Sequence, residues 1–153
     1  MFKKVSKLFR LTWIEKLLFL EAFLLTGIIR FAILFLSFNK LARFSGKYKK
    51  ESSKTISNKD EAIIRKVGWA VFAASKRTPW ESKCLVRALT AQLMLSTRKV
   101  SSTLYLGVAR DKEKKLIAHA WLRSGKDIIT GANEMEEFTE VARFANDGGR
   151  RMI

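Results

Sequence analysis

Apolar residues recur at three- and four-residue steps between Thr12 and Phe44, which predicts one or two amphipathic helices at the start of the chain. The apolar positions fall on more than one side of the helix, so we expect this region to be buried between partners. Charged side chains interrupt the run at Glu15, Lys16, Glu21 and Arg30. These charges favour packed helices over a membrane-spanning segment or a signal peptide. An interfacial membrane segment stays open as an alternative, because the residues before the run are basic.

A second helical pattern covers residues 57–75. Ser57 is an N-cap residue type, and Asp60 follows three positions later, as in a capping box. The buried stripe of this helix consists of Ile63, Ile64, Val67, Ala70, Val71 and Ala74. Pro79, the only proline of the chain, then predicts a turn.

The period of the pattern changes after a third helix, which starts at Cys84 and runs to about Ser96. Alternating apolar residues then predict strands, the first with one buried face and the last at an edge, over 100–109, 117–123, 127–130 and 138–144. Helices followed by a small antiparallel sheet predict an α+β fold.

Composition divides the chain into four segments. Residues 1–44 form the N-terminal amphipathic helical region, and residues 45–58 are basic and serine-rich, which predicts a linker. Residues 59–145 hold the α+β core, and residues 146–153 form a basic tail. Because 48% of all residues are hydrophobic, the chain can build a real hydrophobic core.

The chain is strongly basic, with 30 Lys and Arg against 14 Asp and Glu and a formal net charge of +16. This charge predicts attraction to nucleic acid, an anionic membrane face or an acidic peptide or protein. No groove-entering helix with a known nucleic-acid motif is present in the sequence. A single cysteine cannot form an internal disulfide, so we expect a cytoplasmic protein, with membrane association left open. We expect no metal and no cofactor.

The only cysteine, Cys84, and the only histidine, His119, are the candidate reactive residues. The free N–H groups of a helix start, together with Lys83 and Arg87, stabilise a thiolate at Cys84. A histidine within reach completes an ion pair and later protonates the leaving amine. The backbone N–H of Cys84 is the natural oxyanion donor. Most lone cysteines and histidines are structural, so spacing alone leaves both roles open.

The residues around Cys84 and His119 carry a family resemblance. They are the run 84–89 (Cys-Leu-Val-Arg-Ala-Leu), the strand 104–108 (Leu-Tyr-Leu-Gly-Val) and the run 118–121 (Ala-His-Ala-Trp). In this order and spacing they resemble the transglutaminase-like leader peptidases of lasso-peptide biosynthesis. The similarity covers roughly residues 80–131 and, more weakly, 138–144.

The resemblance implies a papain/transglutaminase-like core, in which the helix of Cys84 packs on a small antiparallel sheet that carries His119. It implies a cysteine protease that removes the leader from a ribosomally made lasso precursor. A separate ATP-dependent macrolactam cyclase then uses the freed amine. In split systems of this family, a small winged-helix protein binds the leader and delivers it to the protease.

One position departs from the family pattern. The family usually carries an Asp twelve residues after the histidine, where this chain has Gly131. With a three-residue turn at 124–126, His119 faces Gly131, and Asp127 lies about 13 Å along the strand, too far to orient His119. Asn133 is the nearest polar side chain on that face, and we take it as the third catalytic residue. Thr130 or a backbone carbonyl are alternatives.

Trp80 and Trp121 are the aromatic residues nearest to the two reactive positions, so we take them as candidate substrate-groove residues, with core packing as the alternative. For Arg87, support of the local fold is the better interpretation. We also expect the N-terminal helices to cover one side of the core and to help form the docking surface for the leader-binding partner.

Two other functions stay open. A basic binding module for nucleic acid or an anionic membrane surface explains the net charge without any chemistry. A transglutaminase-like acyl transferase uses the same cysteine and histidine on another substrate.

Overall fold

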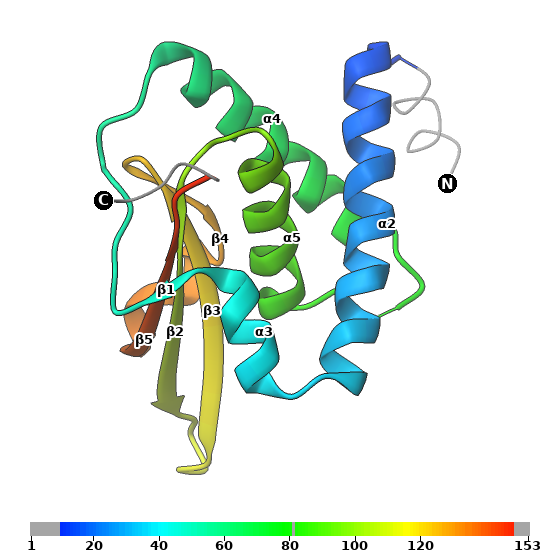
Figure 1. Cartoon of the computed structure of the whole chain (residues 1–153). Coiled ribbons are helices and arrows are strands. Elements are labelled where there is room, and N and C mark those ends of the chain that lie inside the picture. The colour runs from blue at the N-terminus through cyan, green and yellow to red at the C-terminus, as the bar shows by residue number, and fades with distance from the viewer. Residues whose placement is uncertain (1–9, 81, 149–153) are drawn as a thin grey trace.

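The computed structural model describes residues 10–80 and 82–148, and its centre is a five-stranded antiparallel sheet with helices on one face (Figure 1). The strand order is β1-β5-β2-β3-β4. The strands are β1 (Lys47–Tyr48), β2 (Ser102–Arg110), β3 (Leu116–Ser124), β4 (Asp127–Thr130) and β5 (Thr139–Asn146). A short 3-10 helix, η1 (Ala132–Glu137), connects β4 to β5. The predicted α+β fold is confirmed.

Local capping signals set the starts of two helices. The N-terminal helical region forms α2 (Trp13–Phe35) and α3 (Phe38–Ser45). The Thr12 hydroxyl accepts from the Glu15 N–H at 3.2 Å, and the Glu15 carboxylate accepts from the Thr12 N–H at 3.0 Å. The next helix, α4 (Asn58–Ser75), starts where the sequence predicts, because the Ser57 hydroxyl accepts from the Asp60 N–H at 3.1 Å.

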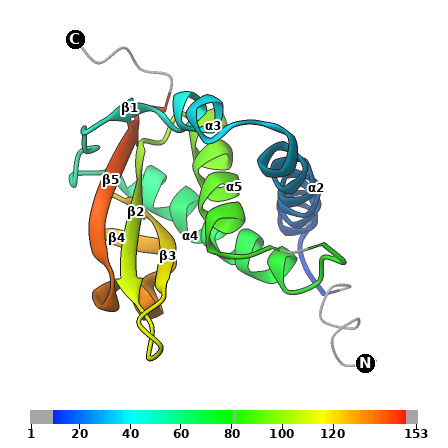
Figure 2. The same cartoon turned by 90° about the horizontal axis from the view of Figure 1, so that it is seen from below.

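Three layers follow from the packing of these helices. The last helix, α5 (Cys84–Thr97), packs with α4 against the sheet, and α2 packs on the far side of both helices (Figure 2). Met94 and Leu95 of α5 meet Leu104 and Leu122 of the sheet in one fully buried core. Leu18, Ala22 and Ile29 of α2 belong to the same core cluster. The expectation that the N-terminal helices cover one side of the core is therefore confirmed.

The first half of β2 and the second half of β3 are buried on both faces. This differs from the prediction of a strand with one buried face. Leu104 faces the helices, whereas Tyr105 points to the opposite face and is only 6% exposed. The segment predicted as a linker covers this opposite face. Its residues 47–48 pair with β5, and Ser52 is buried, with its N–H donating to Thr103 Oγ1 at 2.8 Å. The edge of the sheet is therefore β1, and β5 lies inside it.

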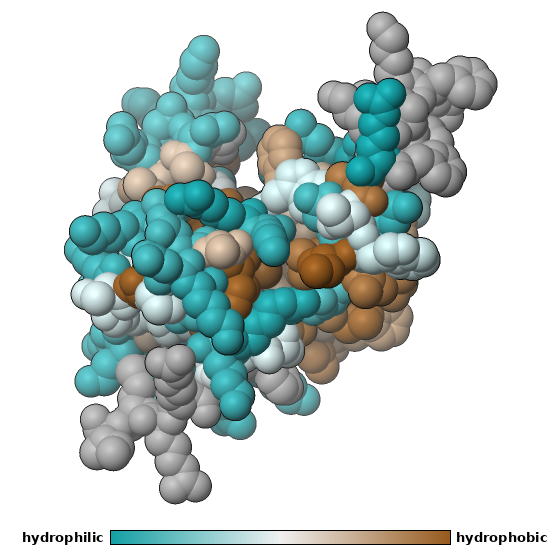
Figure 3. Space-filling view, turned by 90° about the horizontal axis from the view of Figure 1, so that it is seen from above, coloured by the Kyte–Doolittle hydropathy of each residue, from teal (hydrophilic) through white to brown (hydrophobic). Residues whose placement is uncertain are grey.

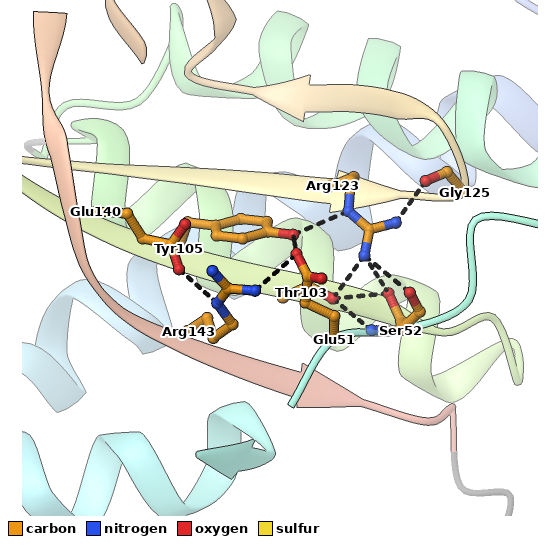
Figure 4. A network of polar contacts seen from close by, with 8 residues as sticks. All are labelled: Glu51, Ser52, Thr103, Tyr105, Arg123, Gly125, Glu140 and Arg143. Atoms are coloured by element: carbon orange, nitrogen blue, oxygen red, sulfur yellow. Dashed lines mark hydrogen bonds and ion pairs between the residues drawn. The ribbon is translucent and has the colours of Figure 1, made fainter. Parts of the chain in front are cut away.

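A polar network fastens this segment to the sheet (Figure 4). Arg123 is buried and donates to Tyr105 OH at 2.9 Å, to Gly125 O at 2.6 Å and to Ser52 O at 2.8 Å. The Tyr105 hydroxyl in turn donates to the Glu51 carboxylate at 2.6 Å. This hydrogen bond lowers the pKa of Glu51, and burial raises the pKa of Tyr105. The basic segment 45–58 is thus an integral covering of the sheet.

The β3–β4 hairpin has a different register from the predicted one. Ser124 pairs with Asp127 and Arg123 with Ile128, so the turn contains two residues and not three. A bulge follows, and Leu122 pairs with Thr130. Gly131 then lies beyond the end of β4 with a φ of +77°. The basic residues Lys3, Lys4 and Lys7 and the last five residues of the predicted tail lie outside the described residues.

Candidate active site

A cleft of about 480 Å³ opens between the two inner helices and the β3–β4 edge of the sheet. Its lining consists of Gly68, Val71 and Phe72 from α4, Lys83, Cys84 and Arg87 around the start of α5, Ala118 and His119 from β3, and residues 129–133. The candidate residues Cys84, His119 and Asn133 therefore share one cleft.

Cys84 is the first residue of α5 and is partly exposed to the cleft as a free thiol. Lys83 is the N-cap residue, and its side chain makes no capping hydrogen bond. The N–H groups of the first turn therefore have no intrahelical partner and lie beside the thiol. The positive end of the helix dipole favours an anion here, either the thiolate or the oxyanion of an acyl-transfer intermediate.

Arg87 holds the turn that precedes the thiol. Its Nε donates to the Ser82 carbonyl oxygen at 2.9 Å, and the Ser82 hydroxyl shares a 2.7 Å hydrogen bond with Thr78. Ser82 is buried, so these contacts fix the backbone entering α5. Arg87 also lines the cleft, which lets its charge act on a bound substrate.

The imidazole of His119 is fixed in place and in tautomer. Its Nε2 lies 2.9 Å from the Gly131 carbonyl oxygen, and a carbonyl only accepts, so Nε2 carries the proton. The Nδ1 atom of the neutral ring is then the proton acceptor. Trp121 stacks against the ring at 5.9 Å, and Phe138 lies at 5.0 Å between centroids. With 8% exposure, His119 has little freedom to turn.

The partner of His119 is a backbone carbonyl, that of Gly131, at the position where the resemblance predicts an Asp. Gly131 adopts a left-handed φ of +77°, and a Cβ there would lie 2.6 Å from the Ala120 carbonyl oxygen. Only glycine fits this conformation without displacement of the neighbouring strand. Asn133 lines the cleft, but the hydrogen bond of His119 in the described residues goes to Gly131. The backbone-carbonyl alternative therefore has the direct contact, and catalysis through Asn133 stays a prediction.

The other rivals for this position are placed elsewhere. Thr130 lines the cleft with a buried hydroxyl that has no hydrogen-bond partner among the described residues. Asp127 pairs with Ser124 beside the hairpin turn and is not part of the cleft lining. An unpaired buried hydroxyl costs about 1–3 kcal/mol.

The thiol and the imidazole face the same cleft without a direct hydrogen bond between them in the described part of the chain. Catalytic hydrogen bonds in substrate-free sites are often long and tighten when the substrate binds. The geometry therefore places an oriented imidazole and a helix-start thiol in the lining of one cleft.

The two candidate groove tryptophans lie outside the cleft lining. Trp80 packs on α2: its Nε1 donates to Thr26 Oγ1 at 3.1 Å, and its ring meets Phe23 edge-on at 5.1 Å. Trp121 is 5% exposed and stacks between Tyr105 and His119. The structure thus places both indoles in packing contacts.

The described lining of the cleft carries basic side chains. Lys83 and Arg87 are the charged residues among the described side chains that line it. Within residues 10–80 and 82–148, no three His, Cys, Asp or Glu side chains come together as a metal site requires. The reactive groups that the described lining offers are a thiol and an imidazole, beside the backbone N–H groups at the start of α5.

Several residues of the site carried no signal in the sequence. For Phe138 the sequence predicts only a place in a strand, whereas in the structure its ring packs on the imidazole. Gly68, Val71 and Phe72 read as part of an ordinary helix, yet they form one wall of the cleft. Their role depends on contacts between segments far apart in the chain, which periodicity does not report.

Comparison with known proteins agrees with this geometry. The family model of the transglutaminase-like superfamily matches residues 26–143, a range that contains the cleft and both reactive residues. No curated protein and no solved structure gives a significant match. The predicted leader-peptidase resemblance is thus supported at the level of the superfamily. From the match over most of its length, this chain belongs to the transglutaminase-like superfamily.

Proposed function

We propose that this protein is a cysteine peptidase that removes the leader from a ribosomally synthesised lasso-peptide precursor. The superfamily points to thiol chemistry of the protease or acyltransferase type. The observation that carries the proposal is the shared cleft, which is lined both by Cys84 at a helix start and by His119, whose Nε2–H donates to the Gly131 carbonyl oxygen. The leader-peptidase specificity rests on the resemblance of the runs 84–89 and 118–121.

The reaction follows from these atoms. Nδ1 of His119 takes the thiol proton, and the thiolate of Cys84 attacks the carbonyl carbon of the scissile amide. The oxyanion meets the N–H groups at the start of α5. The imidazolium then gives its proton to the leaving amine, which departs with the core peptide, and the leader stays bound as a thioester. Water, deprotonated by the imidazole, hydrolyses the thioester and restores the thiol.

The charge of the protein favours an acidic substrate or carrier. Lys83 and Arg87 line the cleft, and the whole chain carries a net charge of +16. Opposite charge raises the encounter rate of a leader, or of a leader-bearing winged-helix partner, with this surface. The ATP-dependent macrolactam cyclase would receive the freed core peptide.

The test is incubation of the purified chain with the lasso precursor encoded beside it, with and without the leader-binding protein. Mass spectrometry should show cleavage at one bond, stimulated by that partner and absent from the Cys84→Ala variant. Cleavage that survives Cys84→Ala would contradict the proposal.

The same experiment separates hydrolysis from acyl transfer. A primary amine added in excess competes with water for the thioester. Products that carry the amine in place of a free carboxylate, with no hydrolysis in its absence, would assign the protein to the acyltransferases and overturn the peptidase function.

A further inference from the structure

The outer side of α2 is entirely apolar. Every residue of this helix that is exposed carries an apolar side chain: Trp13, Ile14, Leu17, Leu20, Leu24, Ile28, Phe31, Leu34 and Phe35. Their exposed fractions range from 52% at Leu20 to 79% at Trp13. A water-facing helix of a soluble protein normally carries polar side chains on this face, so this stripe is built for contact with an apolar medium.

The inner side of α2 is already occupied. Leu18, Ala22 and Ile29 lie in the core, and Thr26 accepts the hydrogen bond of Trp80. By length and composition α2 could cross a bilayer, a property shared by core helices and signal sequences, but only 22% of its most apolar window is buried. A helix that is held along one side by α4 and α5 meets an apolar medium with the other side only.

The charges that border the stripe are those that anionic headgroups attract. Lys16 lies over the Trp13 ring, Arg77 lies over the Phe19 ring, and Lys66 lines a groove beside Leu17. Lys40 and Arg43 of α3 are exposed beyond the other end of α2.

Both acidic residues of α2 accept hydrogen bonds from the protein. Glu15 caps the helix by accepting from the Thr12 N–H, and Glu21 accepts from Arg98 Nη1 at 3.0 Å. The stripe is therefore apolar in the middle and cationic at its borders, which is the charge pattern of a helix that lies in a bilayer interface.

The stripe and the cleft lie on different sides of the molecule. The cleft is on the sheet side of α4 and α5, whereas α2 packs on their other side (Figure 2). In the space-filling view, apolar residues gather on the side where α2 runs, and hydrophilic residues cover most of the remaining visible surface (Figure 3). Contact through α2 leaves the cleft open to water and to a peptide substrate.

We propose that the outer face of α2 binds the surface of an anionic lipid bilayer, with the helix lying parallel to the membrane and its apolar stripe inserted below the headgroups. Apart from the indole N–H of Trp13 at the first residue of α2, the stripe offers no hydrogen-bonding side chain, whereas protein interfaces normally pair polar groups at about one hydrogen bond per 100–200 Å². Hydrocarbon requires no such pairing. The bordering lysines and arginines contact the headgroups, while α4, α5 and the sheet stay in water. This inference holds whichever reaction the cleft catalyses.

The test is flotation of the full-length protein with vesicles of phosphatidylcholine mixed with phosphatidylglycerol, and with phosphatidylcholine alone. We expect binding to the anionic vesicles that weakens with added salt. Leu17→Glu with Leu24→Glu should lower the vesicle-bound to free ratio by about tenfold or more. The matched control is Leu116→Glu with Val141→Glu, which adds the same charge at exposed apolar positions of the sheet and should bind nearly as well as the wild type.

A spectroscopic measurement covers the case in which the stripe variant does not fold. Trp13 is at the exposed start of α2, so its fluorescence should shift to shorter wavelength on anionic vesicles, and the shift should be missing from Trp13→Phe.

Four results would overturn the proposal: no binding to anionic vesicles, equal losses in the stripe and control variants, resistance of the bound protein to alkaline carbonate extraction as for a spanning helix, or a dimer or protein complex that covers the stripe in place of lipid. Cleavage of the precursor without vesicles reports on the proposed function separately.

Discussion

His119 and Arg123 lie on the same face of β3, and both are nearly buried, with exposed fractions of 8% and 6%. Their surroundings are opposite. Arg123 donates to Tyr105, Gly125 and Ser52, so each of its nitrogens has an acceptor. His119 has one hydrogen bond in the described residues, to Gly131, and its ring borders a cleft that holds the thiol.

The difference shows that a buried polar side chain can serve either the stability of the fold or the reaction. Arg123 cannot change its partners without a loss of stability, because each of its three nitrogens donates within a buried network. His119 is held by one nitrogen while the other stays open to take and give a proton. Two rings, Tyr105 and Trp121, stack at 5.7 Å between the rigid end of the strand and the reactive one.

The largest expected effect tests the reactive end at its thiol. Cys84→Ala should reduce precursor cleavage to the uncatalysed level, because no other side chain of the cleft supplies a thiolate. Cys84→Ser should be almost as inactive, since a hydroxyl is much harder to ionise. Mass spectrometry of the products measures the loss. Thermal unfolding should change little, because Cys84 is partly exposed.

His119→Ala should lower the cleavage rate by about 10²–10⁴-fold, the usual contribution of a general base. Alkylation of Cys84 by iodoacetamide should also slow near neutral pH, because the thiolate loses its imidazolium partner. Asn133→Ala is the matched control within the cleft and should cost less than His119→Ala. An unchanged alkylation rate and pH profile in His119→Ala would rule out the thiolate–imidazolium pair.

Arg123→Met should destabilise the fold by about 3 kcal/mol or more, because the acceptors on Ser52, Gly125 and Tyr105 lose a buried donor. Urea unfolding measures this loss. Arg143→Met is the control: its ion pair with Glu51 is part-exposed and should contribute about 1 kcal/mol or less. Under conditions that keep Arg123→Met folded, the Cys84 alkylation rate should match that of the wild type. A slowed rate would show that the two ends of β3 act as one functional unit.

Gly131→Ala should cost more than about 1 kcal/mol, because alanine strains a backbone with φ of +77° and its Cβ meets the Ala120 carbonyl at 2.6 Å. The shift of Gly131 should also release the His119 hydrogen bond and slow alkylation of Cys84. Gly68→Ala provides the control, since this glycine lines the same cleft from within α4 and an added Cβ meets only the Ile129 side chain at 3.1 Å. Equal effects in the two variants would argue against a special role for the Gly131 carbonyl.

The smallest effect concerns pH at the rigid end of β3. The hydrogen bond from Tyr105 lowers the folded-state pKa of Glu51 below 4.5, so its contribution to stability is present above pH 4.5 and is lost as the pH falls through the folded value. Glu51 is 41% exposed, so solvent screening limits this contribution to about 1 kcal/mol or less. Glu51→Gln should therefore unfold with a weaker pH dependence than the wild type below pH 4.5. Parallel stability curves for the two proteins would exclude this role.

Features that depend on neighbours in the chain were predictable. The start of α4 follows from Ser57 and Asp60, which interact across one helical turn. The start of α5 at Cys84 and the positions of β2 to β4 follow from apolar periodicity. The pairing of a helix-start cysteine with a later strand histidine was also visible, and the structure places both residues in one cleft.

Features that depend on distant contacts were not predictable. The segment 45–58 has the composition of a solvated linker, yet Ser52 is buried because Thr103 and Arg123 offer it hydrogen bonds across the sheet. The partner of His119 was open for a related reason. A bulge between Leu122 and Arg123 sets the hairpin register, and the sequence contains no strong signal for a bulge there.

The sequence by itself determined the α+β class, the helix that carries Cys84 and the strand that carries His119, because capping and periodicity act over a few residues. Tertiary structure alone decided that the Gly131 backbone orients the imidazole and that Trp80 and Trp121 serve as packing residues. It also decided which side of the apolar helix α2 is covered. The physical reason is that hydrogen-bond partners and buried area depend on which segments meet in space. The local pattern of a segment is compatible with many such meetings and does not select one of them.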